Sequence, residues 1–299
     1  MNKIAIYIPT YRCRYDKILN YINNFDKRFD VYVVFSTYDE HINDYDKIDL
    51  SNATKLYCDA KTIGGKRQFT IDYLYNKGYK YALQIEDDVR PTASKITEET
   101  KRTTSNSYAK LKIDINELLI KMVDTIIDNN ACFVSPSFPF NLGFSTPGVI
   151  SINKSLNFGQ CHIIDLEQVF NNNIKYDTRE NVHDDIDIVL QMIQHGLMCI
   201  TLKDYSFELI PSSSLSENST ICNGNKQDIM RINLYLKYRD GISLRIGKHG
   251  ELRLTCKLDK YYNTLNIPIK NDAYHQCLYE LCKDYKIEEI KKLIKNKFL

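Results

Sequence analysis

Residues 81–90 read Tyr-Ala-Leu-Gln-Ile-Glu-Asp-Asp-Val-Arg, and this stretch decides the expected fold and the expected chemistry. The apolar run at its start is typical of a buried strand, and three acids follow it directly. Neighbouring carboxylates repel one another unless a divalent cation neutralises them. Their hard oxygens suit Mg²⁺ or Mn²⁺, which also bind diphosphates. The alternative is a solvated acidic turn, the usual surroundings of carboxylates. The stretch therefore predicts a metal site at the end of a core strand.

The chain before this stretch alternates between strand and helix patterns. Residues 4–8 and 31–35 are β-branched runs that predict strands, and a helix is expected to begin at Asp16. Residues 66–76 have apolar side chains at helical spacing and end before the stop signal Gly78. This alternation predicts a parallel sheet with right-handed crossovers. Ligands of such sheets bind beyond the carboxyl ends of the strands, where the acids lie.

The middle of the chain is expected to begin with a mobile loop. Residues 89–112 are rich in Ser, Thr, Lys and Glu, which predicts either a lid beside the acids or a disordered insertion without a role. Asp114 and Glu117 then form a pair that resembles a capping box, which predicts the start of a helix. The remaining expected elements are strands at 131–135, 160–164 and 197–202, a helix at 185–195, a hairpin at 235–257 and two helices within 271–299.

These patterns together predict an α/β protein. We expect a mixed, mainly parallel sheet of Rossmann type flanked by helices, with a C-terminal β-hairpin and a helical extension. The composition agrees with a globular protein, since 43% of the residues are hydrophobic and 26% are charged.

Charge and cysteine content exclude several classes of protein. The net charge is +2, so no global basic field indicates nucleic acid. The nine cysteines have no CxxC spacing and no paired-histidine zinc pattern, so reduced and mostly buried thiols are expected. The sequence enters a strand directly after Met1 and has no apolar run of membrane-spanning length. These features predict a soluble, cytoplasmic protein without a membrane partner.

A second acidic cluster, formed by Asp184, Asp185 and Asp187, opens the helix expected at 185–195. The helix dipole and free amide groups stabilise a carboxylate at this place, as a general base requires. The alternative is plain helix capping, for which Asp is a preferred residue. Three acids within four residues exceed what one cap needs, so we expect one of them to be catalytic.

Two further stretches offer groups for a phosphate or a nucleobase. Glycines allow close approach of the backbone at a helix start, and cations offset the phosphate charge. The alternatives are an ordinary turn for the first stretch and an ordinary strand-to-helix loop for the second. The candidate residues are Gly64, Gly65, Lys66 and Arg67 in the first stretch, and Pro9, Thr10, Tyr11, Arg12 and Arg14 in the second.

A local excess of positive charge lies between residues 226 and 257, which include eight Lys or Arg against three Asp or Glu. Strand alternation would place Arg245, Arg253 and Lys257 on an exposed face within reach of phosphates, beside Lys248 at the hairpin turn. A solvated strand face is the alternative.

Four of these stretches, at residues 9–14, 62–68, 86–88 and 183–187, resemble in their order the GT-A class of glycosyltransferases. Within that class, the sequence is most similar to the TET-associated DNA glycosyltransferases, relatives of the base J glucosyltransferase found in phages and some eukaryotes. The resemblance covers approximately residues 1–257, weakly between 90 and 155, and rests on order and spacing. The matching stretches are YIPTYRCRYDK, TIGGKRQFTIDYL, YALQIEDDV, GQCHIID and HDDIDIVLQMIQHGLMC, and residues 219–225 followed by a basic strand.

The resemblance implies an enzyme that moves a sugar from a UDP-sugar to the hydroxyl of a hydroxymethylated pyrimidine in DNA. Asp88 would bind Mn²⁺ or Mg²⁺ with help from Glu86, which stands where Asp is commoner, and Asp185 would deprotonate the acceptor hydroxyl. The other implied roles are donor contacts for Arg67 and Asp87, nucleobase contacts for Thr10 and Tyr11, DNA contacts for Arg245, Lys248 and Arg253, and a weak third metal ligand at His249.

The expected organisation follows from the same resemblance. Residues 1–210 would form the GT-A catalytic core, with a nucleotide-sugar half at 1–90, the mobile loop at 89–112 and an acceptor half at 113–210. Residues 211–299 would pack on this core. Two alternatives stay open, namely a GT-A glycosyltransferase with a polysaccharide, protein or small-molecule acceptor, and a non-catalytic module that binds a sugar nucleotide or DNA.

Overall fold

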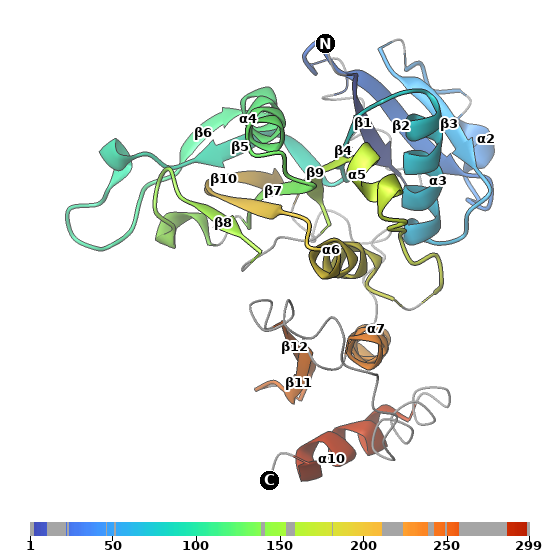
Figure 1. Ribbon diagram of the computed structural model, residues 1–299, viewed down its shortest axis with the longest axis vertical. Helices are drawn as coiled ribbons and strands as arrows, with labels where there is room; N and C mark the ends of the chain where they lie inside the picture. Colours follow the sequence, from blue (N-terminus) through green and yellow to red (C-terminus); the bar gives the residue numbers. More distant parts are fainter. Residues whose placement is uncertain are drawn as a thin grey trace.

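The computed structural model contains one mixed sheet of ten strands with helices on both faces (Figure 1). The strand order is β3-β2-β1-β4-β9-β7-β10-β5-β6, with β8 beside β10. Because β1, β2, β3, β4, β7 and β10 run in the same direction, the predicted α/β class with a mainly parallel sheet is confirmed. The structure describes residues 3–10, 22, 24–45, 47–50, 52–138, 141–153, 159–180, 182–210, 224–238, 242–248, 250–256 and 286–297.

The N-terminal half of the sheet is parallel and buried on both faces. Every residue of β1 and β4 is buried, which is typical of parallel strands covered by helices on either side. β1 lies between β2 and β4, so the carboxyl ends of β1 and β4 lie side by side. The elements of this half are β1 Ile4–Pro9, β2 Asp30–Ser36, α2 Ile42–Tyr45, β3 Thr54–Cys58, α3 Ile63–Asn76 and β4 Tyr81–Ile85.

The second half of the sheet mixes both directions. β9 runs antiparallel to β4 and β7, and β10 pairs with β7 on one side and with β8 and β5 on the other. An irregularity between Leu202 and Ser206 allows β10 to meet β8 and β5 in turn along one edge. The elements are β5 Val89–Lys95, η1 Glu98–Thr100, β6 Leu111–Asp114, α4 Ile115–Asp128, β7 Phe133–Ser137, η2 Leu142–Phe144, β8 Ile150–Ile152, β9 Cys161–Asp165, α5 Leu166–Asn171, α6 Asp184–Gln194 and β10 Cys199–Leu209.

The two faces of the sheet carry separate apolar cores, because side chains alternate along each strand. Tyr7 belongs to the core shared with α3, α5 and α6, whereas Ile6 and Ile8 belong to the core shared with α2 and α4. Asp114 is the N-cap of α4, and its side chain accepts a hydrogen bond from the Asn116 amide, so the predicted helix start is confirmed.

The C-terminal part consists of α7 Gly224–Lys237, β11 Ile242–Ile246, β12 Leu252–Cys256 and α10 Ile287–Lys297. It packs on the face of α6, since Ile232, Leu244 and Ile290 belong to the same core as that helix. The predicted hairpin is confirmed, but its expected start at Tyr235 is wrong. Residues 224–237 form a helix because Ile229, Ile232 and Tyr235 recur at a spacing that buries one helical face.

Residues 89–112 differ from the expected loop. Val89–Lys95 pairs with β10, and Leu111–Asp114 pairs with β5. Main-chain hydrogen bonds to neighbouring strands satisfy the backbone N–H and C=O groups of this polar segment. It therefore joins the sheet without an apolar pattern of its own. The longest run of exposed side chains in this segment is the turn at 101–106, and β5 lies between this turn and Asp88.

Several predictions lie outside the described residues. They include nearly all of the helix expected from Asp16 and the first of the two helices expected within 271–299. Within the described ranges, no helix is both long enough and apolar enough to cross a membrane.

Candidate active site

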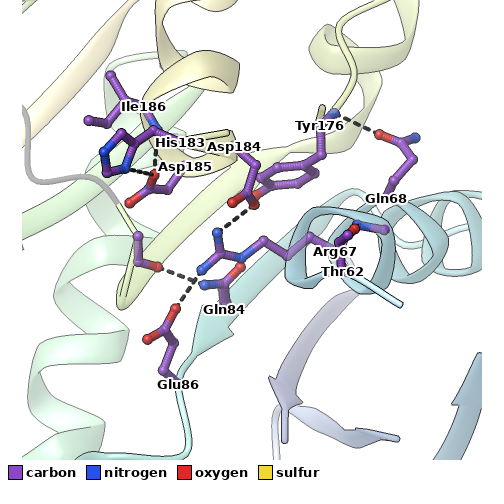
Figure 2. A network of polar contacts seen from close by, with 12 residues as sticks. Thr62, Arg67, Gln68, Gln84, Glu86, Tyr176, His183, Asp184, Asp185 and Ile186 are labelled. Atoms are coloured by element: carbon purple, nitrogen blue, oxygen red, sulfur yellow. Dashed lines mark hydrogen bonds and ion pairs between the residues drawn. The ribbon is translucent and has the colours of Figure 1, made fainter. Parts of the chain in front are cut away.

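The acids at the end of β4 meet the start of α6 through one guanidinium group. Arg67 of α3 donates from Nη1 to Asp184 Oδ2 at 2.6 Å and from Nη2 to Glu86 Oε1 at 2.5 Å (Figure 2). The side chain of Arg67 is only 4% exposed, against 25% for Glu86. One buried cation therefore joins three elements that are far apart in the sequence.

The chain reaches this geometry because α3 begins earlier than predicted, at Ile63. The side chain of Thr62 caps the helix by accepting from the Gly65 amide at 3.0 Å. A Cβ atom at Gly64 would lie 2.1 Å from the Asp177 carbonyl oxygen and 3.1 Å from Asp184 Cβ. Only glycine permits this approach, which brings Arg67 up to the first turn of α6.

Asp87, the middle acid of the three that follow β4, forms a buried hydrogen-bonded chain with Thr10 and Lys66. Lys66 Nζ donates to the Thr10 carbonyl oxygen at 2.7 Å, and Thr10 Oγ1 donates to Asp87 Oδ2 at 3.0 Å. Burial lowers the pKa of Lys66. These predicted donor-binding residues are all buried and contact one another, as is Pro9 at the end of β1.

The three acids of α6 point to three different surroundings. Asp184 is bound to Arg67, and Asp187 is bound to Lys237 at 2.6 Å and to the hydroxyl of Tyr238 at 2.5 Å. The side chain of Asp185 stays 26% exposed, accepts from the Ile186 amide at 2.9 Å and lies 3.9 Å from the His183 ring (Figure 2). Among the three, Asp185 alone is available to a substrate. The carboxylate of Asp187, which was also expected as a candidate base, is buried and bound to Lys237, Tyr238 and Gln191.

Burial and like charge shift the pKa values of the paired acids. Burial raises the pKa of Glu86 to about 7, with Arg67 opposing the rise and Asp88, Asp87 and Asp185 adding to it. Burial also raises the pKa of Asp184 to about 6, again opposed by Arg67. The charges of Asp88 and Asp185 both affect the pKa of Glu86, so the acids after β4 and the acid of α6 share one electrostatic environment.

A buried polar network beneath the acids was not predicted from the sequence. Gln84 Nε2 donates to the Gly159 carbonyl oxygen at 2.7 Å, and His162 Nδ1 lies 2.9 Å from the same oxygen. His162 Nε2 lies 3.1 Å from the Tyr176 hydroxyl, and burial lowers the pKa of His162 to about 3, so its ring is neutral. Gly159 has φ +110° and leaves no room for a Cβ, which would lie 2.8 Å from Asp185 Oδ2.

A signal for this network was present in the sequence. Gln84 and His162 each interrupt an otherwise apolar strand, and both are buried opposite each other on β4 and β9. A polar side chain in a buried strand needs a hydrogen-bond partner. The sequence therefore indicated a buried network but not which other residues belong to it.

The described residues that suit a divalent cation are Asp88 and Glu86. Magnesium-type ions in nucleotide sites are held by one or two carboxylates together with phosphate oxygens. The two acids fit this pattern, because burial and then the charge of Asp88 raise the pKa of Glu86, and a bound cation would offset both effects. Over the described ranges, no group of three His, Cys, Asp or Glu side chains is arranged around a single ion position.

The predicted acceptor residues lie on the C-terminal hairpin. Arg245 and Arg253 face each other across β11 and β12, both exposed, and Lys248 is exposed in the turn. Arg253 is paired with Glu251 at 2.5 Å, which reduces the net positive charge that Arg253 adds to the hairpin. In Figure 1 this hairpin lies beyond α6 from the sheet, so it is not part of the Arg67 cluster. Tyr11, Arg12, Arg14, His249 and Lys257 lie outside the described residues.

Comparison with known proteins gives this arrangement a family. The sequence model of the TET-associated glycosyltransferases matches residues 4–209, well over half of the chain. The chain belongs to the TET-associated glycosyltransferase family. This family member is a glycosyltransferase of GT-A type. A search of curated protein sequences found no significant match.

Two solved structures share the fold of this TET-associated glycosyltransferase. S. aureus TarS 1-349 has 12% sequence identity and a TM-score of 0.50, covering 99% of this chain and 91% of TarS 1-349. Mannosyltransferase PcManGT from Pyrobaculum calidifontis, in complex with GDP-Man and Mn²⁺, has 12% identity and a TM-score of 0.55, covering 95% of this chain and 73% of the other. At this identity the likeness concerns the fold alone.

Proposed function

We propose that this glycosyltransferase moves a sugar from a UDP-sugar to the hydroxyl of a hydroxymethylated pyrimidine in DNA, with Mn²⁺ or Mg²⁺ bound. The observation that supports this most directly is the Arg67 junction. A donor site at the end of β4 and an acceptor-activating carboxylate on α6 would share one space, since Glu86 and Asp184 are bound to the same guanidinium.

Asp88 and Glu86 are the residues proposed to hold the cation. A divalent ion there supplies positive charge that stabilises the departing diphosphate. Arg67 acts behind them in this proposal, because its two terminal nitrogens are engaged by acids and its side chain is buried. It holds Glu86 and Asp184 in place, a role that differs from the direct diphosphate contact expected from the sequence.

Asp185 is proposed as the general base. Its carboxylate takes the proton of the acceptor hydroxyl while the hydroxyl oxygen bonds to the anomeric carbon of the sugar, and the bond from that carbon to the diphosphate oxygen breaks. The helix N-terminus and the Ile186 amide stabilise the negative charge of Asp185 before the proton arrives.

Two features support DNA as the acceptor. The chain belongs to the TET-associated glycosyltransferase family, and its C-terminal hairpin exposes Arg245 and Lys248. Exposed cations on one face of a hairpin can contact phosphates without reading sequence. The proposed cytoplasmic location is consistent with a DNA substrate.

The proposal is tested by incubating the protein with several UDP-sugars, Mn²⁺, and either hydroxymethylated or unmodified DNA. Mass spectrometry of the digested nucleosides should detect a glycosylated base only with hydroxymethylated DNA. Asp88→Asn and Asp185→Asn should abolish transfer, whereas Asp26→Asn, which changes an acid outside the Arg67 cluster, should not. Full transfer in metal-free buffer or by Asp88→Asn would refute the metal role.

A non-DNA acceptor remains the second candidate. The pairing of Arg253 with Glu251 favours it, because this pairing weakens the positive surface of the hairpin. If a polysaccharide, protein or small molecule is the acceptor, Arg245→Ala and Lys248→Ala will leave transfer unchanged. A non-catalytic module would instead bind the UDP-sugar without releasing UDP, which a nucleotide-release assay measures.

A further inference from the structure

Asp187 is the acid of α6 that faces the C-terminal part of the chain. Its Oδ1 accepts from the Tyr238 hydroxyl at 2.5 Å and from Lys237 Nζ at 2.6 Å, and its Oδ2 accepts from Gln191 Nε2 at 2.8 Å. The Tyr238 hydroxyl also lies 3.2 Å from the Asp187 carbonyl oxygen. The Asp187 side chain is 2% exposed and that of Lys237 is 40% exposed, so this contact is a charged junction between α6 and the end of α7 whose carboxylate is buried.

The junction holds the turn that contains the proposed base. Asp184 and Asp187 lie in the first turn of α6, and the Asp187 amide closes this turn on the His183 carbonyl at 2.9 Å. Arg67 fixes the turn on one side through Asp184, and α7 fixes it on the other through Asp187. Asp185 lies between these two anchors in the sequence, so its orientation depends on both.

Lys237 also reaches the segment that meets α3. Its Nζ lies 3.9 Å from Asp177 Oδ2, and the Asp177 carbonyl is the atom that only a glycine at position 64 can approach. The Lys237 ammonium thus lies near two side chains, those of Asp177 and Asp187, whose segments pack against α3 and form the first turn of α6.

Attachment of the C-terminal part does not by itself require this charge. Ile229, Ile232 and Leu234 already bury α7 in the core shared with α6. Apolar packing is not directional, whereas a buried carboxylate that accepts hydrogen bonds from an ammonium and a hydroxyl fixes one geometry. The charged contact therefore adds orientation to a contact that packing alone would hold.

We propose that Lys237 and Tyr238 are positioning residues, through which the C-terminal part sets the position of Asp185 by way of Asp187. Both residues lie beyond the 4–209 region that the family model matches. The inference rests on the proposed function, in which Asp185 is the base. Displacement of a catalytic group by about 1 Å can lower a rate about 100-fold. A small rotation of α6 that displaces Asp185 would therefore lower the rate measurably.

The test compares Tyr238→Phe and Lys237→Met with the parent protein under saturating acceptor. Each change should lower kcat about tenfold or more, while the KM for the UDP-sugar stays within about twofold, because the donor site on β4 is untouched. Lys237→Arg keeps the charge and should retain more activity than Lys237→Met. Lys237 is 40% exposed, so its variants keep the test valid if Tyr238→Phe does not fold.

Lys291→Met is the matched control. Lys291 Nζ lies 3.4 Å from Asp228 Oδ2 and ties α10 to α7 within the C-terminal part. This variant should lower the melting temperature without lowering kcat. An equal fall of kcat in Lys291→Met and Lys237→Met would overturn the positioning role and leave a merely structural one.

Asp185→Asn separates the two proposals. An inactive Asp185→Asn together with unchanged kcat in Tyr238→Phe and Lys237→Met would refute the positioning role alone. Full activity of Asp185→Asn would refute the base, and the positioning role with it. An inactive Asp185→Asn with the expected fall of kcat in both other variants supports the inference.

Discussion

Among the described residues, Arg67 is the cation that pairs with both Glu86 and Asp184, and the electrostatics of the site depend on it. It lowers the pKa of both acids against the rise that burial causes. Removing one partner of a buried ion pair leaves uncompensated charge, which costs more than the pair itself contributes.

Arg67→Met is therefore expected to destabilise the protein strongly and in a pH-dependent way. At pH 8 the loss should be about 3–5 kcal/mol in the free energy of unfolding, because two ionised acids lose the buried guanidinium that pairs with both of them. At pH 5 both acids are protonated in the folded state, so the loss should be smaller. Urea unfolding at both pH values measures it, with Arg28→Met, which changes a half-exposed arginine, as the control. An equal loss at both pH values would contradict this account.

The raised pKa of Glu86 predicts that metal affinity depends on pH. An acid whose folded pKa is about 7 holds its proton below that value and must release it to bind a cation. The apparent affinity for Mn²⁺ should rise roughly tenfold per pH unit between pH 5 and 7 and level off above pH 7. Calorimetric titration at several pH values measures this. Glu86→Gln removes the titrating group, so the affinity of that variant should vary less with pH.

The folding stability of the metal-free protein should depend on pH in the opposite direction to its metal affinity. Since burial raises the pKa of Glu86 and Asp184 above their unfolded values, their contribution to stability is complete at acidic pH. It is lost as the pH rises through about 6 and then about 7. Metal binding and metal-free stability should therefore change in opposite directions over this range.

Gly159 is expected to be intolerant of a side chain. Gly159→Ala would force a Cβ to within 2.8 Å of Asp185 Oδ2 at a φ of +110°. We expect kcat to fall about tenfold or more, because Asp185 must move. Gly78→Ala is the control, since Gly78 also has positive φ but nothing within 4 Å of its Cβ position. Equal activity of the two variants would show that only backbone strain matters.

At the scale of elements, the site depends on where β4, α3 and α6 begin and end. β4 stops at Ile85, α3 begins at Ile63 and α6 begins at Asp184. Each terminus had a local signal, namely the acids after an apolar run, the paired glycines and the acidic cluster. Periodicity also predicted β1, β2, α4, β7 and β9 to within a few residues.

Elements without a regular apolar pattern were missed. β3, β5, β6 and β8 are short or polar, and they exist because neighbouring strands supply main-chain hydrogen bonds. Long-range pairing of this kind leaves little trace in local composition.

The strand character of residues 89–95 gives a prediction about motion. Amide groups of residues 93–95 that pair with β10 or β6 should be protected from hydrogen exchange, whereas those in the turn at 102–106 should exchange fast. Exchange followed by mass spectrometry of short peptides measures this, with α4 as the protected reference. Fast exchange throughout 89–112 would restore the mobile loop expected from the sequence.

At the scale of the whole molecule, the chain joins an α/β core to a C-terminal part that carries exposed positive charge. The net charge of +2 hides this local excess. The hairpin exposes Arg245, Lys248 and Arg253, of which Arg253 is already paired with Glu251. The proposed DNA contact can therefore be tested through salt dependence.

Arg245→Ala should reduce the slope of log affinity for DNA against log salt by about 0.9, the value expected for one lost phosphate contact. Arg253→Ala should reduce it less, because its guanidinium is neutralised by Glu251. Fluorescence anisotropy with labelled duplex DNA over a range of salt measures both. A slope that neither variant alters would exclude the hairpin from DNA binding.

The sequence by itself determined the class of sheet, the strand that ends in acids and the helix that begins with them. These features depend on local periodicity and on the repulsion of adjacent charges, which are readable along the chain. Only the tertiary structure decided what surrounds each acid. Arg67 and Asp184 are 117 residues apart, and their contact arises from the packing of α3 against α6. The same packing buries Asp184 and Asp187, which are three residues apart and share one face of α6, and leaves Asp185 on the adjoining face partly exposed.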